Sequence, residues 1–247
     1  IATAAGQTVR LGGRRAEARI FRPLIERDPP LRQTGTAVRV DSPPALDGTL
    51  DAFDTSAALA LDHEDQYRRS EEPYSGPEDF SALASVNWDD DALYLGVEVI
   101  KPDIVLRAAD AAPLLLDNEP DDIHSDGLQV YVRLEPDGPV YGFLVAPEPE
   151  GEALRVRVAA GYAGTPEMVG GAWAPADVGY ILTLELRLPG WQSRTYGDHI
   201  GFDLLINEML PERERRSGQL VWSGGSGWVW LRGDRQPPDR LGELELA

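Results

Sequence analysis

An acid-rich segment in the middle of the chain, residues 114–126 (LLLDNEPDDIHSD), has side chains that could hold a divalent cation. Its candidate ligands are Asp117, Asp121, Asp122 and Asp126. Calcium takes roughly six to eight oxygen ligands, and such a loop could supply several of them. The segment lacks the spacing of an EF-hand loop, so a solvated acidic loop is the alternative. Calcium fits these oxygens better than zinc does, because the three histidines are scattered and cysteine is absent.

Aromatic side chains lie close together in a second segment, SGWVWLRGDR, at residues 226–235. Trp228 and Trp230 are two positions apart, so on a strand both rings would point to the same face. The pair follows a glycine-rich loop and could form a platform for a ligand. The alternative is that both rings cover the open end of a hydrophobic core.

Three consecutive acids, Asp89, Asp90 and Asp91, lie between two apolar stretches in NWDDDALYLGVEVI. Aspartate is favoured in turns because its carboxylate accepts hydrogen bonds from nearby backbone amides. We therefore expect a hairpin turn here, and a cation site is the alternative.

Sequence motifs of the common enzyme classes are missing. The chain has no GxSxG nucleophile elbow, no phosphate-binding loop, no dinucleotide fingerprint and no HxxxH pair. Two of the 42 acids could by chance lie at the separation that glycosidases use. Glu185 is the candidate for such a catalytic carboxylate. The interpretation is a protein without catalytic activity.

The composition limits the partners. Lys+Arg is 23 against Asp+Glu 42, which gives a formal net charge of -19. Such a surface repels nucleic acid and anionic lipid, whose binding needs positive charge. It is compatible with neutral ligands and divalent cations. No apolar run approaches the length of a transmembrane segment.

Alternating apolar and polar residues predict the elements that must position these side chains. Leu182, Leu184 and Leu186 alternate with Thr183 and Glu185. They belong to one of nine predicted strands, at 84–88, 92–100, 127–134, 140–147, 154–160, 180–188, 200–209, 220–224 and 241–246, and several of these alternate cleanly. This pattern, with turn residues between the stretches, predicts an all-β fold, an antiparallel β-sandwich of the jelly-roll kind.

Several of these stretches, in this order, resemble the family 9 carbohydrate-binding modules and the wider group of CBM9-like and DOMON-like domains. The matching pieces are ALDGTLDAFD (45–54), VNWDDDALYLGVEV (86–99), SDGLQVYVRL (125–134), YILTLELRLPGW (180–191), IGFDLLINE (200–208) and PDRLGELEL (238–246). The resemblance implies a β-sandwich of two antiparallel sheets, non-catalytic sugar binding and structural calcium. The sugar would stack on aromatic rings while polar side chains bind its hydroxyls.

The resemblance also implies residues for the sugar site. Trp230 matches one platform tryptophan of the family, and Gln129 takes the place of a family glutamate. The second platform tryptophan falls on Ile123, and two further polar positions fall on Leu144 and Gly227. The ligand-binding candidates are therefore Trp230, Trp228, Gln129, Asn207, His124 and Arg232.

Two other functions remain open. The domain could be a structural or protein-interaction subunit of a larger assembly that has kept the sandwich and lost the sugar site. It could also bind haem for electron transfer, as some similar sandwiches do; the candidate axial ligands are Met168, Met209, Lys101 and His124.

The domain organisation follows from the same pattern. Residues 1–36 are interpreted as an N-terminal arm or linker that a partner protein or parent-chain domain could contact, and 37–247 as the sandwich domain. We expect a module that binds the end of a mono- or oligosaccharide, as an appendage of a larger extracytoplasmic protein, periplasmic or secreted.

Overall fold

The computed structural model describes residues 7–11, 14–18, 32–70, 72–114, 120–225, 227–229 and 235–247. The chain divides into two compact units, residues 1–31 and 32–247. In the first unit, β1 (Gln7–Leu11) and β2 (Arg14–Ala18) form an antiparallel hairpin. In the described residues no helix has the length and apolar character needed to span a bilayer.

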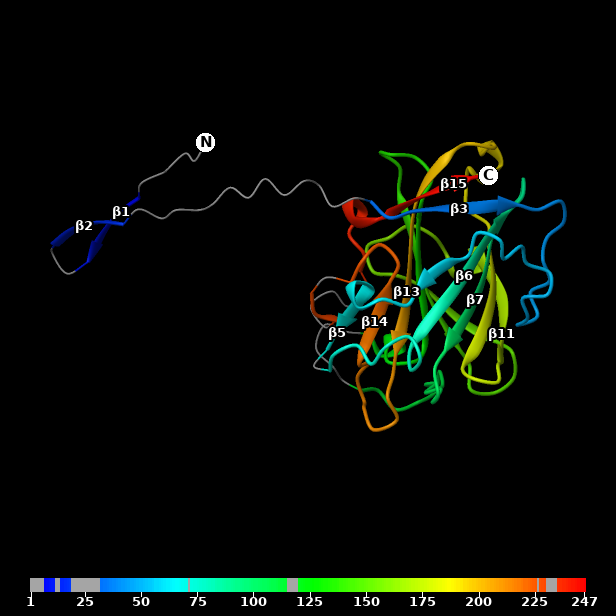
Figure 1. The fold of residues 1–247 in the computed structure, drawn as a ribbon, viewed down its shortest axis with the longest axis horizontal. Helices are drawn as coiled ribbons and strands as arrows, with labels where there is room; N and C mark the ends of the chain where they lie inside the picture. The colour runs from blue at the N-terminus through cyan, green and yellow to red at the C-terminus, as the bar shows by residue number, and fades with distance from the viewer. Residues whose placement is uncertain are drawn as a thin grey trace. The chain divides into compact units, whose positions relative to one another are not determined.

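Two packed sheets make up the second unit (Figure 1). Sheet I runs in the order β10 (Leu154–Val158), β9 (Val140–Pro147), β8 (Gly127–Arg133) and β13 (His199–Glu208). The far side of β13 pairs at its start with β15 (Gly242–Leu246) and at its end with β14 (Gly218–Val221), which pairs in turn with β5 (Tyr67–Arg69). Sheet II consists of β4 (Leu59–Leu61), β6 (Ser81–Trp88), β7 (Leu93–Ile100), β12 (Tyr180–Leu186) and β11 (Val169–Pro175).

Strand β3 (Thr34–Arg39) joins the two sheets. It pairs in parallel with β15 of sheet I, and its last two residues pair in parallel with β6 of sheet II. Single 3₁₀ turns connect the strands: η1 (Glu64–Gln66), η2 (Asp121–Ile123), η3 (Pro166–Met168), η4 (Trp191–Ser193) and η5 (Pro238–Arg240). The unit that contains the sandwich thus includes residues before the predicted domain start at 37.

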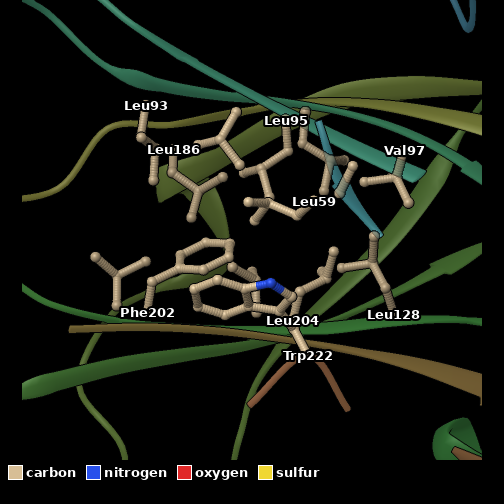
Figure 2. Packing of buried hydrophobic residues seen from close by; sticks show 14 of the residues in the cluster. Leu59, Leu93, Leu95, Val97, Leu128, Leu186, Phe202, Leu204 and Trp222 are labelled. Atoms are coloured by element: carbon tan, nitrogen blue, oxygen red, sulfur yellow. The ribbon is translucent and has the colours of Figure 1, made fainter. Parts of the chain in front are cut away.

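The hydrophobic core lies between the sheets, where alternate residues of each strand face the opposite sheet. Figure 2 shows both layers of this core. Sheet II contributes Leu59, Leu93, Leu95, Val97 and Leu186, and sheet I with the residue after β14 contributes Leu128, Phe202, Leu204 and Trp222. All of these side chains are buried, so the interface between the sheets is the main source of apolar burial.

The predicted β-sandwich is confirmed, and its alternating leucines Leu182, Leu184 and Leu186 are buried in the core. Strand β3 is an exception to the antiparallel pairing, because it runs parallel to both of its neighbours. Strands β3, β4, β5 and β11 were also not expected. The first three are only three to six residues long, and β11 (VGGAWAP) contains two glycines, so none shows a clear period of two.

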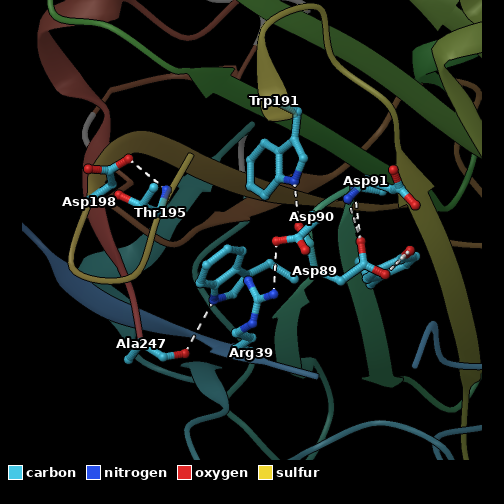
Figure 3. Close-up of polar contacts among 11 residues, drawn as sticks. Arg39, Asp89, Asp90, Asp91, Trp191, Thr195, Asp198 and Ala247 are labelled. Carbon is cyan, nitrogen blue, oxygen red and sulfur yellow. Dashed lines mark hydrogen bonds and ion pairs between the residues drawn. The ribbon is translucent and has the colours of Figure 1, made fainter. Parts of the chain in front are cut away.

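The three consecutive aspartates form the turn between β6 and β7, as predicted (Figure 3). Asp89 Oδ1 accepts hydrogen bonds from the backbone N–H groups of Asp91 and Ala92, at 2.8 and 3.0 Å. Its other oxygen accepts a hydrogen bond of 2.9 Å from the Tyr94 hydroxyl. Asp90 instead pairs with Arg39 on β3. The acids therefore close a hairpin and anchor the neighbouring strand.

Candidate functional site

The candidate site is the outer face of sheet I, the face that points away from the core. Because Leu128, Val130 and Val132 of β8 point into the core, the residues between them point outward. The outer face is formed by Gln129, Tyr131 and Arg133 of β8, Asp203, Leu205 and Asn207 of β13, and Gln219 of β14. Two of the predicted ligand residues, Gln129 and Asn207, thus lie on one face.

A row of hydrogen-bonded polar side chains crosses four strands of this face. Asn207 Oδ1 accepts hydrogen bonds from the amide of Gln129 at 3.4 Å and from the amide of Gln219 at 2.8 Å. Gln219 Oε1 in turn accepts one from the Arg68 guanidinium of β5 at 3.2 Å. We call Gln129, Asn207, Gln219 and Arg68 the polar row. Its members are at most 1% exposed, so here they bind protein groups rather than solvent.

His124 reaches the same network through a neighbouring arginine. The guanidinium of Arg216 donates a hydrogen bond of 3.3 Å to Asn207 Oδ1. The backbone N–H of Arg216 donates to Nδ1 of His124 at 3.2 Å, and both side chains are buried. The structure therefore brings three of the predicted ligand residues, Gln129, Asn207 and His124, into one buried network.

Asp203 is a buried acid on the same face. One of its oxygens accepts hydrogen bonds from the Ser223 hydroxyl and from the Gln236 amide, the latter at 2.7 Å. The other accepts from the backbone N–H groups of Leu204 and Ser223. Burial raises the pKa of Asp203 to about 6 although these donors oppose the rise, because the charged carboxylate has lost its hydration.

Trp228 lies at the far edge of sheet I. It forms a parallel bridge with Arg69 of β5, and the Arg69 guanidinium carbon is 5.0 Å from the centre of its ring. The residue is 37% exposed, so part of the ring faces solvent. Trp228 therefore lies beyond the polar row, separated from Asn207 by β14 and β5. The other two predicted ligand residues, Trp230 and Arg232, lie outside the described residues.

The predicted calcium ligands that the structure describes are bonded to cationic side chains or to backbone amides. Asp126 is buried against Lys101, and Asp122 forms two hydrogen bonds with Arg157. Asp121 accepts a hydrogen bond from the backbone N–H of Leu114. Within the described ranges no three His, Asp or Glu side chains converge as metal ligands would. These pairings do not fit a calcium site, but Asp117 lies outside the described residues and calcium stays a prediction.

Sequence reasoning missed much of this face. Arg68, Arg216, Asp203 and Gln236 belong to the network but were not named as candidates. Arg68 lies in the acid-rich stretch 62–79, where no strand was predicted, and Gln236 follows the aromatic segment. Only Asp203, which alternates with Phe202 and Leu204, had a period-two signal that could have placed it on the outer face.

Solvent reaches the outer face at a hollow near the end of β8. Its volume is about 790 Å³. It is lined by Arg133, Val140, Tyr162, Arg235 and neighbouring residues of three connections. The outer face thus presents a buried polar row and an open hollow, and Trp228 lies at the edge of sheet I, on the side of Arg69 rather than of Arg68.

The comparisons with known proteins agree with this architecture. A family model described as carbohydrate family 9 binding domain-like matches residues 46–247. No curated protein sequence matches the chain.

Two solved structures share the fold, and both are of a carbohydrate binding module family 9 protein from Caldicellulosiruptor kristjanssonii. The complex with cellotriose has a TM-score of 0.63 at 18% identity and covers 87% of this chain and 93% of that one. The complex with glucose has a TM-score of 0.61 at 19% identity, with coverages of 87% and 95%.

Proposed function

Because the chain belongs to the carbohydrate family 9 binding domain-like family, we propose that it is a non-catalytic carbohydrate-binding module. The observation that carries the proposal is the extent of the family match. Residues 46–247 include every strand of both sheets except β3, and with them the whole outer face of sheet I. The sequence-based recognition of the family is confirmed.

The outer face and the edge of sheet I have groups with the chemistry that sugar binding needs. The axial C–H groups of a pyranose ring pack against aromatic faces, and the partly exposed ring of Trp228 offers such a face. Amide and guanidinium groups can bond sugar hydroxyls, and the polar row is built from these groups. In this structure Gln129 and Asn207 bond to each other and to their neighbours, which holds the strands of the face in register. Their direct contact with a sugar remains a prediction.

We further propose that the module serves as an accessory part of a larger extracytoplasmic protein. A module that binds the end of a saccharide is of most use where polysaccharides occur, outside the cytoplasm. The proposal includes no catalysis, because the family description names binding alone.

The proposal is tested by calorimetric titration of the full chain with glucose and with cellotriose, the two ligands of the similar structures. We expect both to bind, and Trp228→Ala to weaken binding about fivefold, since an aromatic contact is worth about 1 kcal/mol. Tyr196→Ala is the matched control, because Tyr196 is an aromatic residue on another loop that is 73% exposed. Repeating the titrations with calcium and with a chelator tests the metal.

A folded chain that binds neither sugar, nor any sugar of a broad glycan array, would overturn the proposal. The protein-interaction alternative would then be tested by looking for a partner of the chain.

A further inference from the structure

The hollow beside Arg133 has three walls that come from separate parts of the chain. One is the turn between β8 and β9, with Gly138, Pro139 and Val140. The second is the connection after β10, residues 160–163, and the third is the connection before β15, with Arg235 and Pro238. Beneath them, Tyr131, Leu205 and Val221 of the outer face form a small apolar cluster against which Val140 and Tyr162 pack.

The walls are held together by specific contacts, so the hollow is formed before a ligand arrives. The Tyr162 hydroxyl donates to the backbone carbonyl of Gln236 at 2.7 Å and accepts from its N–H at 3.1 Å. The Tyr162 ring packs edge-to-face on Tyr131, with ring centres 4.9 Å apart. The Gln236 side chain continues into the buried network at Asp203. A preformed site loses less entropy on binding.

The charge of the hollow is opposite to that of the whole chain. Two arginines, Arg133 and Arg235, line it, and among the residues that the structure describes no aspartate or glutamate does, although the chain carries 42 acids and a net charge of -19. Asp137 and Asp239, which adjoin the lining residues Gly138 and Pro238 in sequence, are exposed and outside the lining, and Asp234, next to Arg235, lies outside the described residues. Across the described residues, neither Arg133 nor Arg235 forms a salt bridge or a side-chain hydrogen bond.

The position of Arg133 is fixed by its neighbours on the sheet. It pairs with Gly201 of β13 on one side and with Val140 of β9 on the other. A Cβ atom at position 201 would lie 3.4 Å from Arg133 Nε, so the glycine leaves room for the arginine stem. Arg133 also shares its strand face with Gln129 and Tyr131. The hollow therefore continues the outer face.

Local charge decides what such a hollow attracts. The screening length is about 8 Å at physiological ionic strength, so distant surface acids are largely screened at the hollow. A guanidinium matches a carboxylate with two parallel hydrogen bonds, and unpaired guanidinium groups have these donors free. The remaining lining, with the Tyr162 ring, two prolines, a valine and alanines, suits the C–H groups of a sugar ring.

We propose that this hollow binds an acidic saccharide, with Arg133 and Arg235 holding the carboxylate of a uronic acid and Tyr162 packing against its ring. The inference rests on the proposed carbohydrate-binding function and names a substrate class for the same outer face.

The test compares ligands that differ in one group. Glucuronic acid and glucose differ only at C6, and the methyl ester of glucuronic acid keeps the shape and removes the charge. Titration of the full chain, followed by NMR or calorimetry, should show glucuronate binding about tenfold more tightly than glucose and the ester, as expected for one charge-assisted contact. Raising the salt concentration should weaken binding of glucuronate alone.

Two variants locate the site. Arg133→Gln and Arg235→Gln should each reduce glucuronate affinity about fivefold, and Arg235→Gln should leave glucose affinity within about twofold. Arg235 is exposed, so its variant keeps the test valid if Arg133→Gln perturbs folding. Arg187→Gln removes the same charge from an arginine outside the hollow that is 60% exposed, and should change neither affinity.

The outcomes separate the inference from the proposed function. Glucose or cellotriose binding without a preference for glucuronate, or a preference that both arginine variants retain, overturns the inference and leaves the function intact. Binding of no sugar at all overturns both. Equal binding of acetate and of glucuronate shows a simple anion site and also overturns the saccharide inference.

Discussion

Lys101 and Asp126 form an ion pair of 2.8 Å in which both side chains are buried. Lys101 is the chain's only lysine, and its ammonium group also donates to the backbone carbonyls of Asp103 and Met209. Asp126 accepts further hydrogen bonds from the backbone N–H groups of Val105 and Met209. The pair thus joins the end of β7 to the start of β8 and the end of β13, so Lys101 is bonded to protein groups and not free to serve as a haem ligand.

Replacing the lysine tests how much this ion pair contributes to the free energy of unfolding. We expect Lys101→Met to lower the free energy of unfolding by about 3–5 kcal/mol, because it leaves the Asp126 carboxylate buried without a cationic partner. Urea denaturation measures the change. Arg39→Met is the control: it breaks the exposed pair with Asp90 and should cost less than about 1 kcal/mol. A loss at Lys101 as small as that of the control would show that the pair does not stabilise the junction.

The double variant Lys101→Met/Asp126→Asn extends this prediction. It removes both charges, so its cost should be clearly smaller than the sum of the two single costs. Additive costs would contradict a direct interaction between the two side chains.

The aspartate turn predicts different effects at adjacent positions. Asp89→Ala should lower stability by about 1–2 kcal/mol, because two backbone N–H groups and the Tyr94 hydroxyl lose their acceptor. Asp91 is exposed, and Asp91→Ala should stay within about 0.5 kcal/mol of the wild type. Thermal unfolding of both variants measures the loss of stability. Equal losses in the two variants would show that the hydrogen bonds of Asp89 in the turn are not its cause.

Asp203 predicts a pH dependence of stability. Its pKa rises from the usual 3.8 to about 6 in the folded chain, so the folded state binds the proton more tightly than the unfolded state does. The resulting stability is fully present below about pH 4 and is lost as the pH rises through about 6. The shift corresponds to roughly 3 kcal/mol.

The matched variant for that prediction is Asp203→Asn, which cannot titrate. The difference in unfolding free energy between wild type and variant should change in favour of the wild type as the pH falls from 7 to 4. Denaturation at a series of pH values gives this difference directly. A difference that stays constant with pH would contradict the raised pKa.

Two glycines with the same backbone conformation predict different tolerance of a side chain. Gly179 and Gly190 have φ of 90° and 87°. A Cβ atom at Gly179 would lie 1.9 Å from the Val99 carbonyl oxygen, whereas at Gly190 it would meet nothing within 4 Å. Gly190→Ala should cost about 1–2 kcal/mol for the left-handed conformation alone, and Gly179→Ala distinctly more. Similar melting temperatures for the two variants would contradict the close approach.

Local pattern was sufficient to predict the parts of the fold that repeat regularly. Leu182, Leu184 and Leu186 alternate over a long strand, and the acids at 89–91 lie between two such strands, so both features could be interpreted without a structure. Strands β3 and β5 could not, because they are short and their neighbours lie far along the chain. Their pairing depends on which edges the two sheets leave open.

The sequence by itself determined the strand pattern, the aspartate turn, the family and two residues of the outer face, Gln129 and Asn207. The strand pattern, the turn and the two outer-face residues follow from residue types at short spacing, which set backbone conformation and burial locally, and the family follows from the order of the matching motifs. Only the tertiary structure decided which polar groups meet. Arg68 and Gln219 are 151 residues apart and bond through the pairing of β5 with β14. Likewise, Lys101 pairs with Asp126 and Arg157 with Asp122, two acids that the sequence analysis had proposed as metal ligands. The packing of the strands, and not the spacing in the sequence, sets the distances between these charges.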